Sequence, residues 1–247
     1  NARDLKVNLA GITDVILSHN HPDHTGGLLH LRRELSKENP ATLSRAHVGP
    51  GIFWSRPRPN SNEEGNSMIA LRPLYEASGG VFVEHREPIQ LYPGVWLTGP
   101  VRRTHSEQKG GGWGLLKAPE GPVEDYVPED MSLVFDTEKG LVVLSGCGHA
   151  GLINTLEHAR DKIRRAPSYA IIGGFHLFNF DDAKLDWTAD KLREFGIRHI
   201  LGAHCTGIEA VYRLRQRAAL DRKSCLVGAV GSSFSLDKGI DPLNLAR

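Results

Sequence analysis

The sequence predicts an α/β fold in which apolar strands alternate with amphipathic helices. Three apolar runs of strand length, residues 14–18, 141–145 and 198–203, each lead into turns that contain glycine or histidine. Apolar residues at helical spacing follow, most clearly over residues 151–165. A chain of 247 residues can bury a large core, and single α/β domains of this size are common. We therefore expect one α/β domain over residues 1–247.

The first elements are predicted by apolar spacing and by stop signals. Residues 1–10 carry apolar positions at helical spacing and predict a short helix before the strand at 14–18. A helix is predicted over residues 28–35, and Asn39-Pro40 stops it. The next predicted segments are a short strand at 46–49 and a polar loop at 55–66.

A turn signal at Pro93-Gly94 lies between two further strand candidates. It predicts that residues 81–84 and 95–98 form antiparallel strands. Residues 101–128 are long, glycine-rich and poorly periodic, which predicts an irregular flap. The remaining predicted elements are a hairpin of residues 132–135 and 140–144, helices at 151–165, 183–195 and 207–219, and strands at 170–172 and 226–230.

Composition is that of an ordinary globular protein. Hydrophobic residues make up 40% of the chain and charged residues 24%, and the net charge is +1. This balance gives no indication of a nucleic-acid partner, and no apolar stretch reaches the 18 residues that a membrane span needs. The three cysteines cannot form a disulfide framework and predict a reducing, cytoplasmic location. Residue 1 is Asn, so the native start of the protein is not in view.

Four metal-ligand residues lie within six positions directly after the first strand. They are His19, His21, Asp23 and His24. Side chains alternate along an extended segment, so His19 and His21 are expected to point to one side and grip one ion. Asp23 and His24 follow at the turn and can grip a second ion. A histidine-rich polar loop is the alternative, but three histidines and one aspartate at a strand end favour metal binding.

Further motifs follow in order along the chain. They are Ser-Gly-Cys-Gly-His-Ala-Gly at 145–151, Gly-Gly-Phe-His-Leu at 173–177 and Gly-Ala-His-Cys-Thr-Gly at 202–207. With the H-x-H-x-D-H motif, the chain resembles the metallo-β-lactamase superfamily. It is similar to one branch in particular, the metal-dependent hydrolases of β-lactamase superfamily II, which includes 7,8-dihydropterin-6-methyl-4-(β-D-ribofuranosyl)aminobenzene-5'-phosphate synthase-like proteins.

The resemblance implies an αββα sandwich that holds two divalent metal ions, with zinc first and manganese or iron as alternatives. It also implies strands before residue 1 that this sequence lacks, so the domain is expected to be incomplete at its N-terminus. His149 and His204, which lie within the first and third of these motifs, are expected to be metal ligands.

One ligand of the superfamily is missing from the sequence. Most members place a bridging aspartate where this chain has His176. His176 is expected either to ligate a metal or to hydrogen-bond a ligand. Asp181 and Asp182 are expected to cap the helix that follows. Cys147 and Cys205, next to predicted ligands, are interpreted as small buried residues.

The expected chemistry is hydrolysis by a hydroxide that two metal ions activate. Asp23 is the predicted catalytic residue, because it would bind a metal and orient that hydroxide. The substrate is expected to be a small molecule, an anionic one if Arg103 contacts it, with Trp113 and His105 as further contacts. An ester, lactone or phosphoester would fit. A dihydropterin transferase and a low-turnover binding protein on the same fold are the alternatives.

Overall fold

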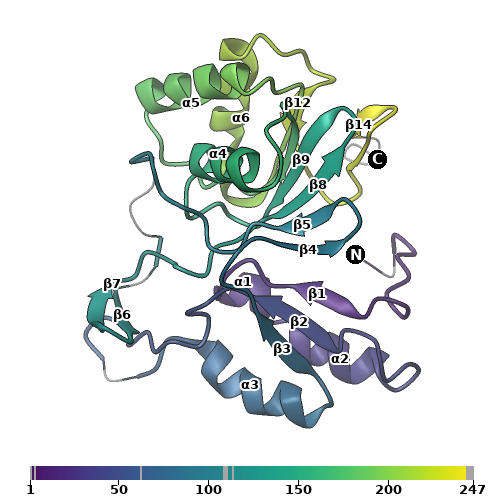
Figure 1. Cartoon of the computed structure of the whole chain (residues 1–247), viewed down its shortest axis with the longest axis vertical. Coiled ribbons are helices and arrows are strands. Elements are labelled where there is room, and N and C mark those ends of the chain that lie inside the picture. Colours follow the sequence, from purple (N-terminus) through teal and green to yellow (C-terminus); the bar gives the residue numbers. More distant parts are fainter. Residues whose placement is uncertain (1, 3, 62, 108–110, 113, 243–247) are drawn as a thin grey trace. The chain divides into compact units, whose positions relative to one another are not determined.

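The computed structural model describes residues 2, 4–61, 63–107, 111–112 and 114–242. The chain forms two compact units (Figure 1). Unit 1 consists of Asn1–Glu87 and Lys109–Asp130, and unit 2 of Pro88–Gln108 and Met131–Arg247. The prediction that residues 1–247 form one domain stays a prediction.

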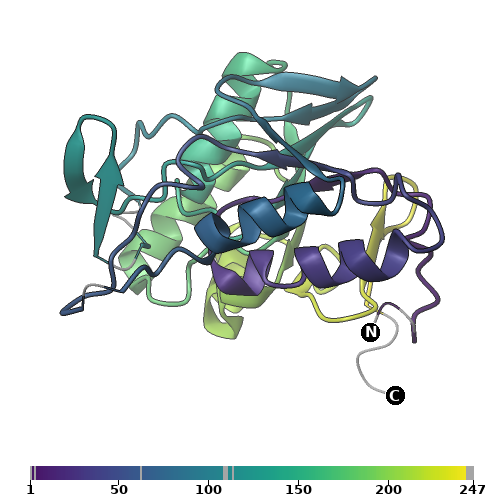
Figure 2. The same ribbon diagram turned by 90° about the horizontal axis from the view of Figure 1, so that it is seen from below.

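A parallel sheet of three strands forms the centre of unit 1. Its order is β1 (Asp14–Ile16), β2 (Arg45–Val48) and β3 (Val81–Glu84). Helix α2 (Leu28–Leu35) connects the first two strands and α3 (Ser67–Ala77) precedes the third, as parallel strands require. The two helices lie side by side (Figure 2). The apolar residues that they bury with the sheet are Leu17, Leu28, Ala46, Val48, Ile52, Met68 and Tyr75.

Two shorter elements complete unit 1. Helix α1 (Pro22–Thr25) begins directly after the first histidines, with Pro22 in its first turn. Proline suits this position because the first turn of a helix has no internal partner for its N–H groups. Strands β6 (Leu115–Ala118) and β7 (Gly121–Glu124) form an antiparallel hairpin.

Unit 2 contains a seven-stranded mixed sheet in the order β12-β11-β10-β9-β8-β5-β4. The strands are β4 (Ile89–Tyr92), β5 (Val95–Leu97), β8 (Leu133–Thr137), β9 (Gly140–Ser145), β10 (Ser168–Gly173), β11 (His199–Gly202) and β12 (Cys225–Val227). Strands β9 to β12 run parallel, and the other neighbours pair antiparallel. A small antiparallel pair, β13 (Ser233–Ser235) and β14 (Gly239–Asp241), follows.

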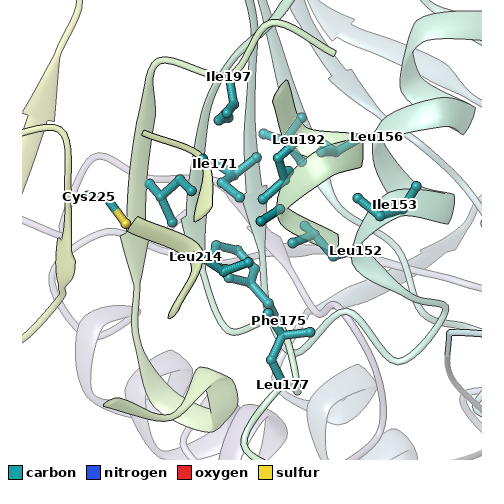
Figure 3. Packing of buried hydrophobic residues seen from close by; sticks show 14 of the residues in the cluster. Leu152, Ile153, Leu156, Ile171, Phe175, Leu177, Leu192, Ile197, Leu214 and Cys225 are labelled. Atoms are coloured by element: carbon teal, nitrogen blue, oxygen red, sulfur yellow. The ribbon is translucent and has the colours of Figure 1, made fainter. Parts of the chain in front are cut away.

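Three helices connect the parallel strands of unit 2 and cover its core. They are α4 (Leu152–Lys162), α5 (Asp182–Glu194) and α6 (Ile208–Arg217). Figure 3 shows Leu152, Ile153 and Leu156 of α4 packed with Ile171 of β10 and Leu192 of α5. This core fixes the carboxyl ends of β9, β10 and β11, which carry the later sequence motifs.

The predicted alternation of strands and helices is confirmed, but three local predictions are wrong. Among residues 1–10, those described form turns and segments without regular secondary structure, not a helix. Strand β3 pairs with β2, whereas β5 pairs with β4 across Pro93-Gly94. The turn signal was correct and the partner was not, because the partner strand Ile89–Tyr92 was not recognised. The segment predicted to be irregular contains the β6–β7 hairpin.

Candidate metal centre

Unit 1 brings three imidazoles together after β1. The ring of His19 lies 4.5 Å from that of His21 and 4.3 Å from that of His24, measured between ring centroids. Asp23 Oδ2 lies 3.4 Å from His24 Nε2. His21 is the N-cap of α1 and has extended backbone dihedrals, so the chain turns between His21 and Asp23. The four predicted ligands of this motif therefore form one cluster.

Neighbouring groups fix the ring orientation of His19 and favour the neutral form of His21. Ser18 Oγ lies 2.9 Å from His19 Nδ1, and such a contact fixes the ring of a histidine that coordinates through Nε2. Burial lowers the pKa of His21, and the carboxylate of Asp23 opposes this shift. A lowered pKa favours the neutral imidazole, which is the form that binds metals.

A cavity of about 480 Å³ lies in unit 1 beside this cluster. It is lined by Asn20, His21, Pro22, Arg56, Arg58, Pro59, Gly65, Ser67 and Asp125. Arg58 is exposed, and its Nε lies 4.0 Å from the carboxylate of Glu63. Because this ion pair is long and exposed to solvent, the guanidinium of Arg58 stays accessible to an anionic ligand. Sequence analysis did not identify this cavity, since its wall comes from the loop at 55–66 that carried only a turn pattern.

Unit 2 forms a second cluster at the ends of β9 and β10. Cys147, His149 and His176 offer ligand atoms that all lie within 4.8 Å of one another. The rings of His149 and His176 are 4.6 Å apart between centroids. This arrangement brings His176 to the position where it can act as a ligand together with His149.

A third cluster of ligand atoms in unit 2 contains Cys147, His204 and Cys205. Cys147 Sγ lies 3.6 Å from His204 Nδ1, at the start of a 3₁₀ turn, His204–Thr206. A hydrogen bond with Cys147 lowers the pKa of the Cys205 thiol to about 4, against an opposing contribution from burial. A lowered pKa favours the thiolate, which is the ligand form of cysteine.

Gly173 and the left-handed backbone of His176 and His204 determine where these two histidine side chains lie in unit 2. A Cβ on Gly173 would lie 2.0 Å from the Ser145 carbonyl oxygen, so only glycine lets β10 end so close to β9. His176 and His204 have φ of 51° and 52°, a conformation that residues other than glycine seldom adopt. Thr206 donates to the Gly173 carbonyl oxygen and accepts from the Phe175 N–H, which links the segments that carry both histidines.

The predicted substrate residues have three different outcomes. Arg103 donates from Nη1 to the carbonyl oxygen of His149, 2.8 Å away, so it supports the ligand segment. His105 lies 3.3 Å from Glu157 and packs against Trp187, on the wall of a different cavity within unit 2. Trp113 lies outside the described residues. Contact of these residues with substrate stays a prediction.

Other predictions concerned residues next to the ligands. Asp181 caps α5, because its side chain accepts a hydrogen bond from the Lys184 N–H, as predicted. Cys147 was interpreted as a small buried residue and is buried, whereas Cys205 is only partly buried. Both thiols also lie among candidate ligand atoms.

The donors that these clusters offer fit a metal. Imidazole nitrogens and thiolate sulfurs predominate, with one carboxylate, a set that suits zinc or iron better than magnesium or calcium. In unit 2 the ligand atoms already lie within 4.8 Å of one another. The residues present therefore fit the metal ions that the sequence motif implies.

The described helices are all too short or too polar to cross a bilayer.

Comparison with known proteins agrees with the motif. The sequence pattern of the metallo-beta-lactamase superfamily matches residues 2–147. A Methanocaldococcus jannaschii protein named 7,8-dihydropterin-6-methyl-4-(beta-D-ribofuranosyl)-aminobenzene-5'-phosphate synthase is 35% identical over 215 residues, which cover 85% of this chain and 71% of the relative. An uncharacterized protein of the same archaeon is 27% identical over 83% of this chain and 73% of its own length.

A solved structure shares the fold. It is a metal-dependent hydrolase of the β-lactamase superfamily with a TM-score of 0.71 and 24% identity, over 92% of this chain and 81% of the other. Strand-end histidines, donor chemistry and the sequence match over more than half of the chain lead to the same assignment. The chain belongs to the metallo-β-lactamase superfamily and has its fold.

Proposed function

We propose that this protein is a metal-dependent hydrolase of a small-molecule ester, lactone or phosphoester. The observation that carries the proposal is the donor set: histidines, one aspartate and two cysteines gathered after β1 in unit 1 and after β9, β10 and β11 in unit 2. Structural polar clusters rarely consist so largely of imidazoles and thiols at strand ends, whereas metal sites do.

Two divalent ions are proposed, with zinc as the first choice. His19, His21 and His149 would hold one ion, and Asp23, His24 and His204 would hold the other, with His176 as a further ligand. This division follows the order of the motifs in the superfamily. When bound, the ions would make a water molecule nucleophilic at neutral pH and polarise the oxygen under attack.

The chain's own residues would supply orientation and binding. The exposed carboxylate of Asp23 would accept a hydrogen bond from the attacking water and so direct its oxygen. The cavity of about 480 Å³ beside His21 would bind the substrate, with Arg58 paired to an anionic group. Water adds to the carbonyl or phosphoryl centre, and the leaving oxygen departs with its electron pair and takes up a proton.

A synthase is the second candidate, and the 35% identity to the Methanocaldococcus relative favours it. In that reaction the amine nitrogen of a ribosylated aminobenzene phosphate would form a bond to the 6-methyl carbon of a dihydropterin and would lose its proton. A pyrophosphate group would leave from the pterin with the electron pair of its bond. The same cavity would then hold a phosphorylated substrate near Arg58.

Substrate screening separates these candidates. Zinc-loaded protein is offered esters, lactones and phosphodiesters, and separately a dihydropterin pyrophosphate with the ribosylated aminobenzene phosphate. His149→Ala serves as the metal-deficient control. Hydrolysis that disappears in the control supports the hydrolase, and pyrophosphate release that requires both substrates supports the synthase. Tight ligand binding without any product would contradict both and favour a low-turnover binding protein.

A further inference from the structure

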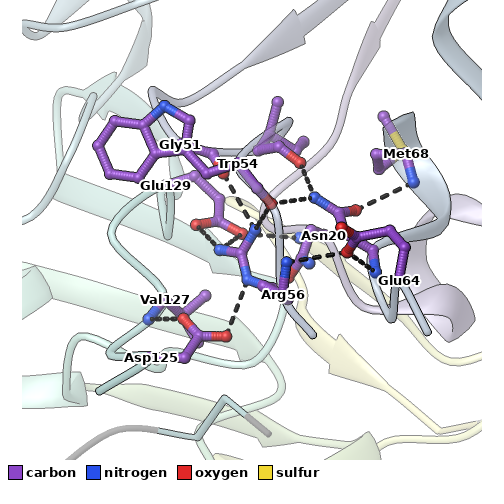
Figure 4. Close-up of polar contacts among 11 residues, drawn as sticks. Asn20, Gly51, Trp54, Arg56, Glu64, Met68, Asp125, Val127 and Glu129 are labelled. Atoms are coloured by element: carbon purple, nitrogen blue, oxygen red, sulfur yellow. Dashed lines mark hydrogen bonds and ion pairs between the residues drawn. The ribbon is translucent and has the colours of Figure 1, made fainter. Parts of the chain in front are cut away.

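Arg56 is a buried arginine at the centre of a polar network in unit 1 (Figure 4). Its Nε donates to Asp125 Oδ2 at 2.8 Å, and its Nη2 donates to both carboxylate oxygens of Glu129 at 3.0 and 2.8 Å. Its Nη1 donates to the carbonyl oxygens of Gly51 and Trp54. Arg56, Asp125 and Glu129 are all at most 7% exposed.

The network leaves Arg56 little capacity to bind a substrate, although it lines the cavity. All three nitrogens of its guanidinium already donate to carboxylates or to backbone carbonyls. A guanidinium satisfied in this way fixes the groups around it. Arg58, which is exposed on the same cavity wall, is the better candidate for an anionic ligand.

The network contacts the metal motif through Asn20, the residue between His19 and His21. The Asn20 backbone N–H donates to Glu129 Oε1 at 3.2 Å. When the amide nitrogen of Asn20 faces Glu129 and its amide oxygen faces Arg56, the nitrogen donates to Glu129 Oε1 at 3.0 Å and the oxygen accepts from Arg56 Nη1 at 3.2 Å. Asn20 is 5% exposed, so both its backbone and its side chain are held inside the unit.

We propose that Glu129 and Arg56 are positioning residues that hold Asn20, and through it aim His19 and His21 at a metal ion. The inference rests on the proposed function, since it concerns ligands of the proposed centre. The backbone bends at His19 and Asn20, so fixing the residue between the two ligands fixes the path of the backbone that carries both. Groups that orient ligands in this way typically change metal affinity about 10–100-fold when they are lost.

Close packing at Gly49 supports a fixed position for Glu129. Gly49 follows β2, and a Cβ there would lie 2.3 Å from the Glu129 carbonyl oxygen and 2.8 Å from its Cα. The segment that carries Glu129 therefore lies directly against the end of the sheet. Such an approach is open only to glycine, and it limits the movement of Glu129 relative to the strands.

Arg56→Lys tests the proposal, with Arg32→Lys as the matched control. Arg32 is also a buried arginine of unit 1, 2% exposed, and donates to the carbonyl oxygens of Pro40, Thr42 and Ser78. These three acceptors lie outside the metal motif at residues 19–24, so Arg32→Lys reproduces the loss of a buried guanidinium without disturbing Asn20. Glu129→Gln provides a second, nearly isosteric variant in case Arg56→Lys does not fold.

Each protein is loaded with Co²⁺, and its metal affinity is measured by competition with a chelator while the visible absorption of the bound ion is recorded. We expect Arg56→Lys and Glu129→Gln to bind metal about 10–100-fold more weakly and to show an altered cobalt spectrum. Arg32→Lys is expected to melt at a lower temperature with wild-type affinity and spectrum.

Three results would overturn the positioning role. Wild-type affinity and spectrum in both Arg56→Lys and Glu129→Gln would do so, and so would an equal loss of affinity in Arg32→Lys. Neither of these two results contradicts the proposed function as long as the wild-type protein binds metal. A wild-type protein that binds no Co²⁺ or zinc would overturn the proposed function together with the positioning role.

Discussion

At the scale of single residues, His176 and His204 are two of the seven described residues other than glycine that have a positive φ. Both have φ near +50°, where a residue with a Cβ costs about 1–3 kcal/mol. His176 lies beside His149 and Cys147, and His204 beside Cys147 and Cys205. Strain of this kind persists where the surroundings fix it, and here it directs each imidazole toward other ligand atoms.

Replacement of His176 tests whether it occupies the place of the missing aspartate. His176→Ala should weaken loading of the second ion about 10–100-fold, because a ligand or its support is lost. His176→Asp should tighten it, because a carboxylate adds negative charge beside a dication, and aspartate tolerates a positive φ. Zinc titration with a competing chelator measures both, with His176→Asn as the uncharged control.

Identical zinc titrations for all three variants and the wild type would show that His176 has only a structural role. The second ion would then depend on ligands other than His176.

Residues differ in how far the sequence alone could assign them. His19, His21, Asp23 and His24 were predictable because they are adjacent in sequence and follow one strand. The approach of the Cys147 and Cys205 thiols to histidines could not be predicted, because it depends on how the segments after β9, β10 and β11 come together in space. Burial and neighbours that are distant in sequence decide whether a cysteine is a ligand.

At the scale of elements, a line of hydrogen bonds crosses the sheet of unit 1. His47 on β2 bonds Asp14 on β1 through Nε2 and His85, which follows β3, through Nδ1, both at 2.8 Å. Arg45 also donates to Asp14. Burial, and then the neighbouring His47, lower the pKa of His85. This line of hydrogen bonds connects the three parallel strands of unit 1.

Acidification should therefore weaken unit 1. His85 has a lower pKa in the folded than in the unfolded state, so below about pH 6.5 the unfolded chain binds more protons and stability falls as the pH drops. His85→Gln should reduce the loss of melting temperature between pH 7 and pH 5, measured with chelator present. His30→Gln, on the exposed face of α2, is the control, and an equal pH dependence in all three proteins would contradict the account.

Helix α4 depends on a carboxylate from another segment. Its N-cap, Gly151, has no side chain, and Glu107 instead accepts hydrogen bonds from the N–H groups of Ile153 and Asn154. Burial raises the pKa of Glu107 to about 7, although these two hydrogen bonds oppose the shift. The cap was not predictable, because Glu107 lies more than forty residues before the helix.

The raised pKa of Glu107 predicts a second pH effect, of opposite sign. Between about pH 4.5 and 7 the folded state keeps a proton that the unfolded chain releases, so this residue makes stability fall as the pH rises. Glu107→Gln should remove that contribution, up to about 1.4 kcal/mol per pH unit. Denaturant unfolding at several pH values measures the slope, and Glu120→Gln, on the exposed β6–β7 turn, is the control. A slope unchanged by Glu107→Gln would contradict the raised pKa.

Elements with strong periodicity were the ones predicted well. Helix α2 matches its predicted bounds, and the β8–β9 hairpin, α4, α5 and α6 lie where apolar spacing placed them. Helix α3 was missed because Pro73 lies inside it, and β4 because its alternate residues are mostly exposed. A strand's partner depends on tertiary packing, which is why β3 was assigned to the wrong neighbour.

At the scale of the whole molecule, the proposed ligands come from four separate segments of the chain. Metal binding should therefore stabilise the folded state, because an ion that binds only the folded chain shifts the unfolding equilibrium toward it. Removal of metal with a chelator should lower the melting temperature by several degrees, since an ion present at about 100 times its Kd contributes about 2.7 kcal/mol. Differential scanning calorimetry measures the change, and magnesium, a poor match for these ligands, should not restore it. Equal melting temperatures with and without chelator would contradict this.

The fold class could be predicted from the sequence because the strand-end motifs occur in the order typical of one superfamily. The substrate could not, because the walls of the cavity beside His21 come from loops without periodic pattern.

Metal stoichiometry tests the central claim most directly. Purified protein saturated with zinc and freed of excess metal is analysed by inductively coupled plasma mass spectrometry, beside His149→Ala. The account predicts two ions per chain in the wild type and a fall toward one in the variant, because His149 would ligate the first ion. A wild-type chain without bound zinc, or a variant that still holds two ions, would contradict it.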